Sequence, residues 1–300
     1  MGDIKLFKIS GSTATEISGS STPLEKALQQ LIEDNLETCL GIKLLASEYS
    51  TGPKHGGRID SLGLDENGCP VIIEYKRTTN DNVINQGLFY LDWLMDHQGT
   101  FQLLVTEKLG ESVATEIDWS APRLICIAGG FTKYDEHAVQ QINRNIELIR
   151  YRYFNDDLLL LELVNVTTAS QTNASSSGQP AQYKTISETL AEIDGPVSDL
   201  YNEIREYLLS MGDDVQEKTL KYYTAFKRIK NFACLEVKPA KGSVVAFVKI
   251  NPESLSLEDG FTRDMRETGH YGTGELEIVI RDKQDFERAK PLFQQSYDVC

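Results

Sequence analysis

Two acidic residues and a lysine stand at a spacing that suits metal-dependent chemistry on a phosphate. Asp60 precedes the sequence Glu74-Tyr75-Lys76. Side chains alternate along a strand, so Glu74 and Lys76 emerge on the same face. Converging carboxylate oxygens form a hard site for Mg²⁺ or Mn²⁺, and a neighbouring lysine can hold a phosphate oxygen or a water. The expected chemistry is hydrolysis of a phosphodiester bond.

Two strands joined by a turn must bring these residues together. Glu74 and Lys76 end an apolar, β-branched run, and Asp60 lies in a short segment before the turn residues 65–68, Asp-Glu-Asn-Gly. If the strands pair through this turn, Asp60 approaches Glu74 and Lys76 from the neighbouring strand. Tyr75 then faces the other side of the sheet.

An aspartate followed by Glu-x-Lys between predicted helices resembles the PD-(D/E)xK nuclease superfamily, and residues 24–94 are similar to the nuclease domain of NucS-type endonucleases. The resemblance implies a restriction-endonuclease-like mixed sheet flanked by helices, and metal-dependent DNA endonuclease activity. It implies that Asp60 and Glu74 hold the metal and that Lys76 orients water or stabilises the transition state. In this sequence the nuclease-like domain comes first, so we do not transfer the mismatch or branch specificity of NucS enzymes.

A third acidic group is expected on the first predicted helix. Thr22 suits the N-cap, Pro23 the first helical position and Glu25 the third, as in a capping box. The resembled family has a glutamate of this helix at the metal, and Glu25 matches its Leu-Glu-Lys pattern; the carbonyl of Tyr75 is the remaining expected ligand. The alternative is that Glu25 only completes the capping box. Glu33 falls nearly opposite the apolar stripe, so we expect it to face away from the core.

The helix predicted over residues 80–96 carries Gln86 and Tyr90 one turn apart, on one face. NucS-like enzymes have a Gln and a Tyr of this helix beside the catalytic site, so the resemblance implies that Gln86 and Tyr90 support the substrate or the nucleophile. The alternative is half-buried filler. Arg58 and Arg77 flank the catalytic strands, and we expect them to contact phosphates.

The rest of this domain reads as an α/β layout. The pattern predicts a loop over residues 11–22, a strand at 42–49, a loop at 50–57, strands at 101–106 and 123–128, a helix at 133–144, and a closing strand pair at 146–154 and 158–164.

A chain of 300 residues favours two domains. Residues 167–183 contain no charged residue and are rich in Ser, Thr, Gln and Asn, which is typical of a linker. We therefore expect a nuclease-like domain at residues 1–166, a flexible linker at 167–183, and a small α+β domain at 184–300 that resembles a C-terminal module appended to nucleases.

The second domain contains a basic stretch interleaved with aromatic residues. Such a pattern suits nucleic acid, because cations meet phosphates and rings stack on bases. The candidate contacts are Lys221, Lys227, Arg228 and Lys230. The alternative is that the aromatics fill a core while the lysines are solvated. The glycine-rich residues 269–274 lack the Gly-Lys-Ser/Thr of a phosphate-binding loop, and we expect His270 to be structural.

Composition limits the other possibilities. The net charge of −15 argues against a protein that coats nucleic acid nonspecifically, although a local basic patch would still serve a nuclease. No apolar run reaches the roughly 18 residues of a membrane span. The five scattered cysteines indicate reduced thiols, and we expect a cytoplasmic protein. DNA is the expected partner, and a homodimer would be the usual way to cut both strands. The alternative is a non-catalytic interaction module that keeps the fold.

Overall fold

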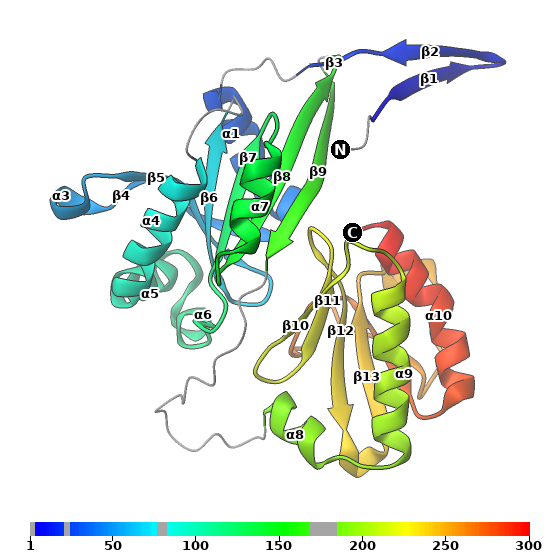
Figure 1. Ribbon diagram of the computed structural model, residues 1–300. Coiled ribbons are helices and arrows are strands. Elements are labelled where there is room, and N and C mark those ends of the chain that lie inside the picture. Colours follow the sequence, from blue (N-terminus) through cyan, green and yellow to red (C-terminus); the bar gives the residue numbers. More distant parts are fainter. Residues whose placement is uncertain (1–3, 21–24, 77–82, 156, 168–184) are drawn as a thin grey trace. The chain divides into compact units, whose positions relative to one another are not determined.

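The computed structural model describes residues 4–20, 25–76, 83–155, 157–167 and 185–300 (Figure 1). The chain divides into two compact units, Met1–Asn173 and Ala174–Cys300. The boundary between them falls inside the expected linker. Thr167 is the last residue of a strand, and the remainder of that linker lies outside the described residues.

The first unit is built on a seven-stranded mixed sheet in the order β3-β8-β7-β6-β5-β4, with β9 paired to β8. The neighbours β6, β7 and β8 run parallel, and the other pairs are antiparallel. All six residues of β7 are buried, as expected for a central parallel strand covered on both faces. The strands are β3 (Gly19–Ser20), β4 (Ile42–Ser50), β5 (Arg58–Asp65), β6 (Pro70–Lys76), β7 (Arg123–Ala128), β8 (Asn145–Phe154) and β9 (Leu158–Thr167).

Helices flank this sheet, which confirms the expected mixed α/β fold (Figure 1). Helix α4 packs on β6 and β7 through a core that includes Leu62, Ile72 and Leu91. Helix α1 packs against β5 and β6 from the opposite face, where Ser61 meets it. The helices are α1 (Glu25–Asp34), α2 (Leu36–Leu40), α3 (Gly52–His55), α4 (Val83–Asp96), α5 (Gln98–Leu109), α6 (Glu111–Thr115) and α7 (Lys133–Gln140).

The expected strand at residues 101–106 is wrong, because this segment belongs to helix α5. Phe101 and Val105, one helical turn apart, are buried, whereas Leu103 between them is 66 % exposed. A short apolar run does not by itself distinguish a strand from a helix. The burial pattern follows the helical period instead.

Two expected loops also contain regular structure. Within residues 11–22 lie β3 and β2 (Thr13–Ile17), which pairs with β1 (Leu6–Ser10) as an antiparallel hairpin. Gly11 turns this hairpin with a positive φ of 58°, which suits glycine. Within residues 50–57 lies the short helix α3. The hairpin is rich in Ser and Thr, and α3 lies among glycines. Both compositions are typical of loops, so the sequence pattern does not reveal these two elements.

The second unit is α+β, as expected, with a six-stranded antiparallel sheet in the order β10-β11-β12-β13-β15-β14. Helices α9 and α10 pack on this sheet around Phe226, Phe232 and Phe293. No helix in the described ranges is long and apolar enough to span a membrane. The elements are α8 (Ile186–Glu192), α9 (Pro196–Ser210), β10 (Gln216–Thr219), β11 (Thr224–Lys227), β12 (Asn231–Lys238), η1 (Pro239–Lys241), β13 (Ser243–Val248), η2 (Pro252–Ser254), β14 (Thr262–Asp264), β15 (Leu276–Ile280) and α10 (Lys283–Asp298).

Candidate active site

The pairing of β5 with β6 brings Asp60 and Glu74 together. Ser61 pairs with Ile73 in antiparallel register, so Asp60 and Glu74 follow as the next cross-strand neighbours. The Asp60 amide donates a hydrogen bond to Oε1 of Glu74 at 3.2 Å, and the Tyr75 amide donates one to Oδ2 of Asp60 at 3.0 Å. Each carboxylate is therefore held by the backbone of the opposite strand.

Glu74 is the most confined group of the site. Its side chain is fully buried, and its Oε2 has no hydrogen-bond partner among the residues that the structure describes. Burial, and then the charge of Asp60, raise the pKa of Glu74 to about 9. Burial also raises the pKa of Asp60 above its ordinary value. Without a cation, this pair does not easily carry two negative charges.

Lys76 emerges beside the two carboxylates. Its side chain is only 19 % exposed, and its Nζ lies 3.3 Å from Oε1 of Glu25. Burial by itself lowers the pKa of Lys76, but the charges of Glu25, Asp60 and Glu74 outweigh it and raise that pKa. The ammonium group therefore stays protonated at neutral pH.

The donor set of this site fits a hard divalent cation. No group of three or more His, Cys, Asp or Glu side chains is arranged to hold a metal within the described part of the chain. Mg²⁺, however, commonly takes only one or two protein carboxylates, together with waters and substrate phosphates. The oxygens of Asp60 and Glu74 and the carbonyl of Tyr75 are of this kind, and the unpartnered Oε2 of Glu74 is the group that a cation would satisfy. Oε1 of Glu25 accepts a hydrogen bond from Lys76, and a role for Glu25 at the metal stays a prediction.

The expectation that Glu33 faces away from the core is wrong. Glu33 is 8 % exposed, and its Oε1 accepts hydrogen bonds from Ser61 at 2.6 Å and from Gln29 at 3.0 Å. Gln29 also donates to the Asp60 carbonyl at 2.9 Å. Leu31 is 39 % exposed. The buried face of α1 is therefore rotated away from Leu31 and toward Gln29 and Glu33. The one-turn spacing of Gln29 and Glu33 was the signal available in the sequence.

Gln86 and Tyr90 do come together on α4. The Tyr90 hydroxyl accepts hydrogen bonds from Nε2 of Gln86 at 3.2 Å and from the Arg58 amide at 3.1 Å. A Cβ on Gly57 would lie 2.5 Å from the Tyr90 ring, so glycine is required for this approach. Tyr90 thus fixes the start of the strand that carries Asp60.

The expected phosphate contacts of the first unit are only partly described. Arg58 is exposed, and its Nε lies 2.5 Å from Oε2 of Glu48. Arg77 lies outside the described residues, as do Thr22 and Pro23 of the expected helix start.

The four candidate basic residues of the second unit differ in their exposure. Lys227 is only 4 % exposed, because β11 is a buried inner strand. A lysine that contacts a phosphate must be accessible from solvent, and Lys227 is not. Arg228 pairs with Asp214 at 2.7 Å. Lys230 is half-buried and Lys221 is exposed.

Comparison with known proteins shows similarity over nearly the full length to an uncharacterized protein from Haemophilus influenzae. The two are 26 % identical over 304 residues, which span 98 % of this chain and 99 % of that protein. Within the second unit, residues 186–299 match the family described as Domain of unknown function (DUF5655).

Two solved structures resemble part of the chain. A repair endonuclease from Pyrococcus abyssi is 23 % identical with a TM-score of 0.29, over 43 % of this chain and 47 % of that one. EndoMS in a complex with double-stranded DNA is 21 % identical with a TM-score of 0.24, over 42 % of this chain and 43 % of that one. The chain thus covers less than half the length of either structure.

Proposed function

We propose that the first unit is a metal-dependent endonuclease that hydrolyses phosphodiester bonds in DNA. The observation that carries this proposal is the buried Oε2 of Glu74, without a partner among the described residues and beside the Asp60 carboxylate. A buried carboxylate oxygen without a hydrogen-bond partner destabilises the fold, and a bound cation would satisfy it. Lys76, on the same strand face, adds the fixed cation that phosphate chemistry needs.

The residues at the site divide into ligands and supports. Asp60 and Glu74, with the Tyr75 carbonyl, would hold Mg²⁺ or Mn²⁺. When bound, such a cation lowers the pKa of the attacking water and neutralises charge that develops on the phosphate. Gln29 holds the Asp60 carbonyl on the α1 side of the sheet.

Lys76 is the group that we assign to the reacting phosphate. Its Nζ is held by Glu25 at 3.3 Å and remains charged, so it can orient the attacking water or stabilise a phosphate oxygen. Glu25 sets the direction of the ammonium group. Tyr90 and Gln86 would act outside the ligand set. The Tyr90 hydroxyl accepts a hydrogen bond from the Arg58 amide at the start of β5, and Gln86 donates one to the same hydroxyl.

The experiment that tests this function is cleavage of labelled single-stranded, duplex, branched and mismatched DNA, and of RNA, by the full chain with Mn²⁺. We expect at least one DNA form to be cut, with activity lost in EDTA and in Asp60→Asn. Binding of nucleic acid without any metal-dependent cutting would instead indicate a non-catalytic module that keeps the fold.

A further inference from the structure

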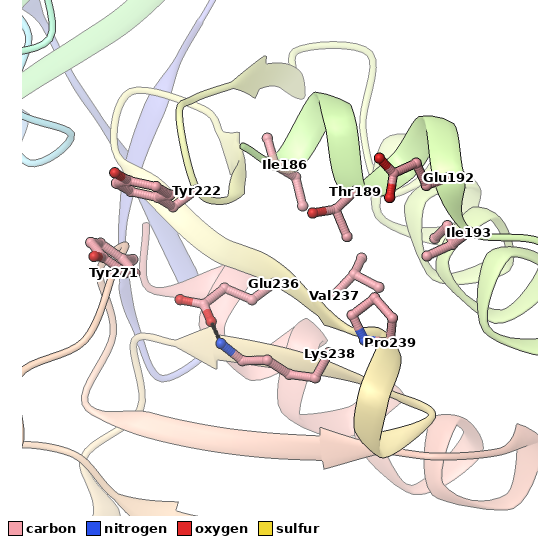
Figure 2. A pocket seen from close by; sticks show the side chains of 10 residues that line it. All are labelled: Ile186, Thr189, Glu192, Ile193, Tyr222, Glu236, Val237, Lys238, Pro239 and Tyr271. Atoms are coloured by element: carbon pink, nitrogen blue, oxygen red, sulfur yellow. Dashed lines mark ion pairs between the residues drawn. The ribbon is translucent and has the colours of Figure 1, made fainter. Parts of the chain in front are cut away.

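A pocket of about 630 Å³ lies in the second unit, where β12 extends beyond its neighbour β11 (Figure 2). The pairing of β11 ends with Thr224 opposite Leu235, whereas β12 continues to Lys238 and pairs over these last residues with β13, its one strand neighbour there within the described part of the chain. Helix α8 closes the open side, since the Ile186 amide donates a hydrogen bond to the Lys221 carbonyl at 2.8 Å. The volume is in the range of small-ligand sites.

Two tyrosines form one wall of this pocket. The rings of Tyr222 and Tyr271 lie 4.5 Å apart with a tilt of 34°, and Tyr271 is 42 % exposed. The loop that carries Tyr271 lies flat on β12, because Gly272 has a φ of +84° and a Cβ there would lie 2.7 Å from Cβ of Cys234. The chain is therefore shaped to hold an aromatic face toward the pocket.

An ion pair between a buried glutamate and an exposed lysine forms another side. Glu236 is 5 % exposed and pairs with Lys238 on the same strand face, and Figure 2 shows both side chains within the pocket. A hydrogen-bond acceptor and a hydrogen-bond donor thus stand side by side. Val237, on the opposite face of the strand, lines the apolar part with Ile193 and Pro239.

These features select among ligand chemistries. A free phosphate would meet Glu236 and Glu192, and an organic cation would meet Lys238, so neither charge sign suits the lining. A purely apolar chain would desolvate the Glu236–Lys238 pair without satisfying it. A flat, neutral ring with donors and acceptors on its edge fits both walls, because its face can stack on tyrosine while its edge meets the ion pair.

We propose that this pocket binds a nucleobase, either of a free nucleotide or of an unpaired position in a strand. The base stacks on Tyr271 and presents its edge to Glu236 and Lys238. Lys221 is exposed, and its Nζ lies 5.0 Å from the centre of the Tyr222 ring. At this position near the rim of the pocket it can contact the phosphate attached to the base. This site is separate from the Asp60–Glu74 site and does not depend on cleavage.

The test is calorimetric titration of the full chain, in EDTA, with each deoxyribonucleoside monophosphate, with short single-stranded homo-oligonucleotides, and with inorganic phosphate. We expect saturable binding that Tyr271→Ala weakens by at least about fivefold, the effect of losing one stacked base. Tyr271→Phe should retain binding. Tyr134→Ala is the matched control, since Tyr134 is 73 % exposed on α7 of the other unit.

Binding of both ligand types would identify a nucleotide site, and binding of oligonucleotides alone would identify an unpaired base in a strand; both support the proposal. Absence of saturable binding would overturn it. So would equal affinity of a folded Tyr271→Ala variant and the wild type, or competition by inorganic phosphate alone. Because EDTA removes any metal, failure here leaves the nuclease proposal standing.

Discussion

Asp60 and Glu74 hold each other across two strands, with the Asp60 amide 3.2 Å from Oε1 of Glu74. This hydrogen bond satisfies one carboxylate oxygen of Glu74, and Oε2 is without a hydrogen-bond partner among the described residues. The backbone of β5 therefore fixes the direction in which the other oxygen points. That relationship makes the pair suitable for a cation.

The stability of the metal-free protein should fall as the pH rises through the neutral range. The folded state raises the pKa of Glu74 from 4.5 to about 9, so the folded protein keeps a proton that the unfolded chain releases. The stability from this proton is complete below pH 4.5 and is lost toward pH 9, by about 1.4 kcal/mol per pH unit. Urea unfolding in EDTA at several pH values measures it.

The Glu74→Gln variant should show a flatter dependence over the same range, because it has no proton to release. Glu107→Gln, which changes an exposed glutamate of α5, is the control and should keep the wild-type slope. Equal slopes for Glu74→Gln and the wild type would contradict the assignment of Glu74 as a buried, protonated carboxyl.

Replacement of Lys76 should separate catalysis from metal binding. Lys76 contacts Glu25 and is not a metal ligand in this account, so Lys76→Met should keep the thermal stabilisation by Mn²⁺. DNA cleavage should fall by about a hundredfold or more, as for other groups that stabilise charge in a transition state. Loss of both properties would show that Lys76 is needed to build the site rather than to act in it.

The ion pairs of Arg123 should dominate the stability of the sheet far from the candidate site. Arg123 is buried and contacts Oδ2 of Asp65 at 2.7 Å and both carboxylate oxygens of Glu147 at 2.8 Å. Arg123→Met leaves buried acids without their cation and should cost about 3–5 kcal/mol in urea unfolding. Arg144→Met, at an exposed position, should change stability by less than about 0.5 kcal/mol. If Arg123→Met changed the free energy of unfolding as little as Arg144→Met, the ion pairs of Arg123 would not stabilise the sheet as proposed.

The hydroxyl of Tyr90 should matter for positioning. Tyr90→Phe removes the acceptor for the Arg58 amide and for Gln86, which should cost about 1 kcal/mol of stability. We expect slower cleavage with an unchanged dependence on Mn²⁺ concentration, because the ligands themselves remain. A shifted Mn²⁺ dependence would instead place Tyr90 at the metal.

The candidate site was largely predictable because strand geometry is local. Alternation along β6 puts Glu74 and Lys76 on one face, and the turn after Asp65 sets the register that brings Asp60 opposite Glu74. Neither deduction needs knowledge of distant segments. The same holds for the closing pair β8 and β9, whose turn includes Asn155 with a φ of 51°.

Features that depend on what an element packs against were not predictable. The buried face of α1 includes Gln29 and Glu33, because Ser61 and the Asp60 carbonyl satisfy their polar groups. Only the assembled sheet supplies those partners. Likewise, Lys227 is buried in β11, although its sequence neighbourhood is that of a basic surface.

The most direct test of the central claim is the rate of cleavage as a function of Mn²⁺ concentration, on the best-cut DNA. Wild type and Glu107→Gln should show the same saturable dependence on Mn²⁺. Asp60→Asn and Glu74→Gln should lose cleavage at every Mn²⁺ concentration while remaining folded. Cleavage by either variant at the wild-type rate and Mn²⁺ dependence would contradict a metal site at Asp60 and Glu74.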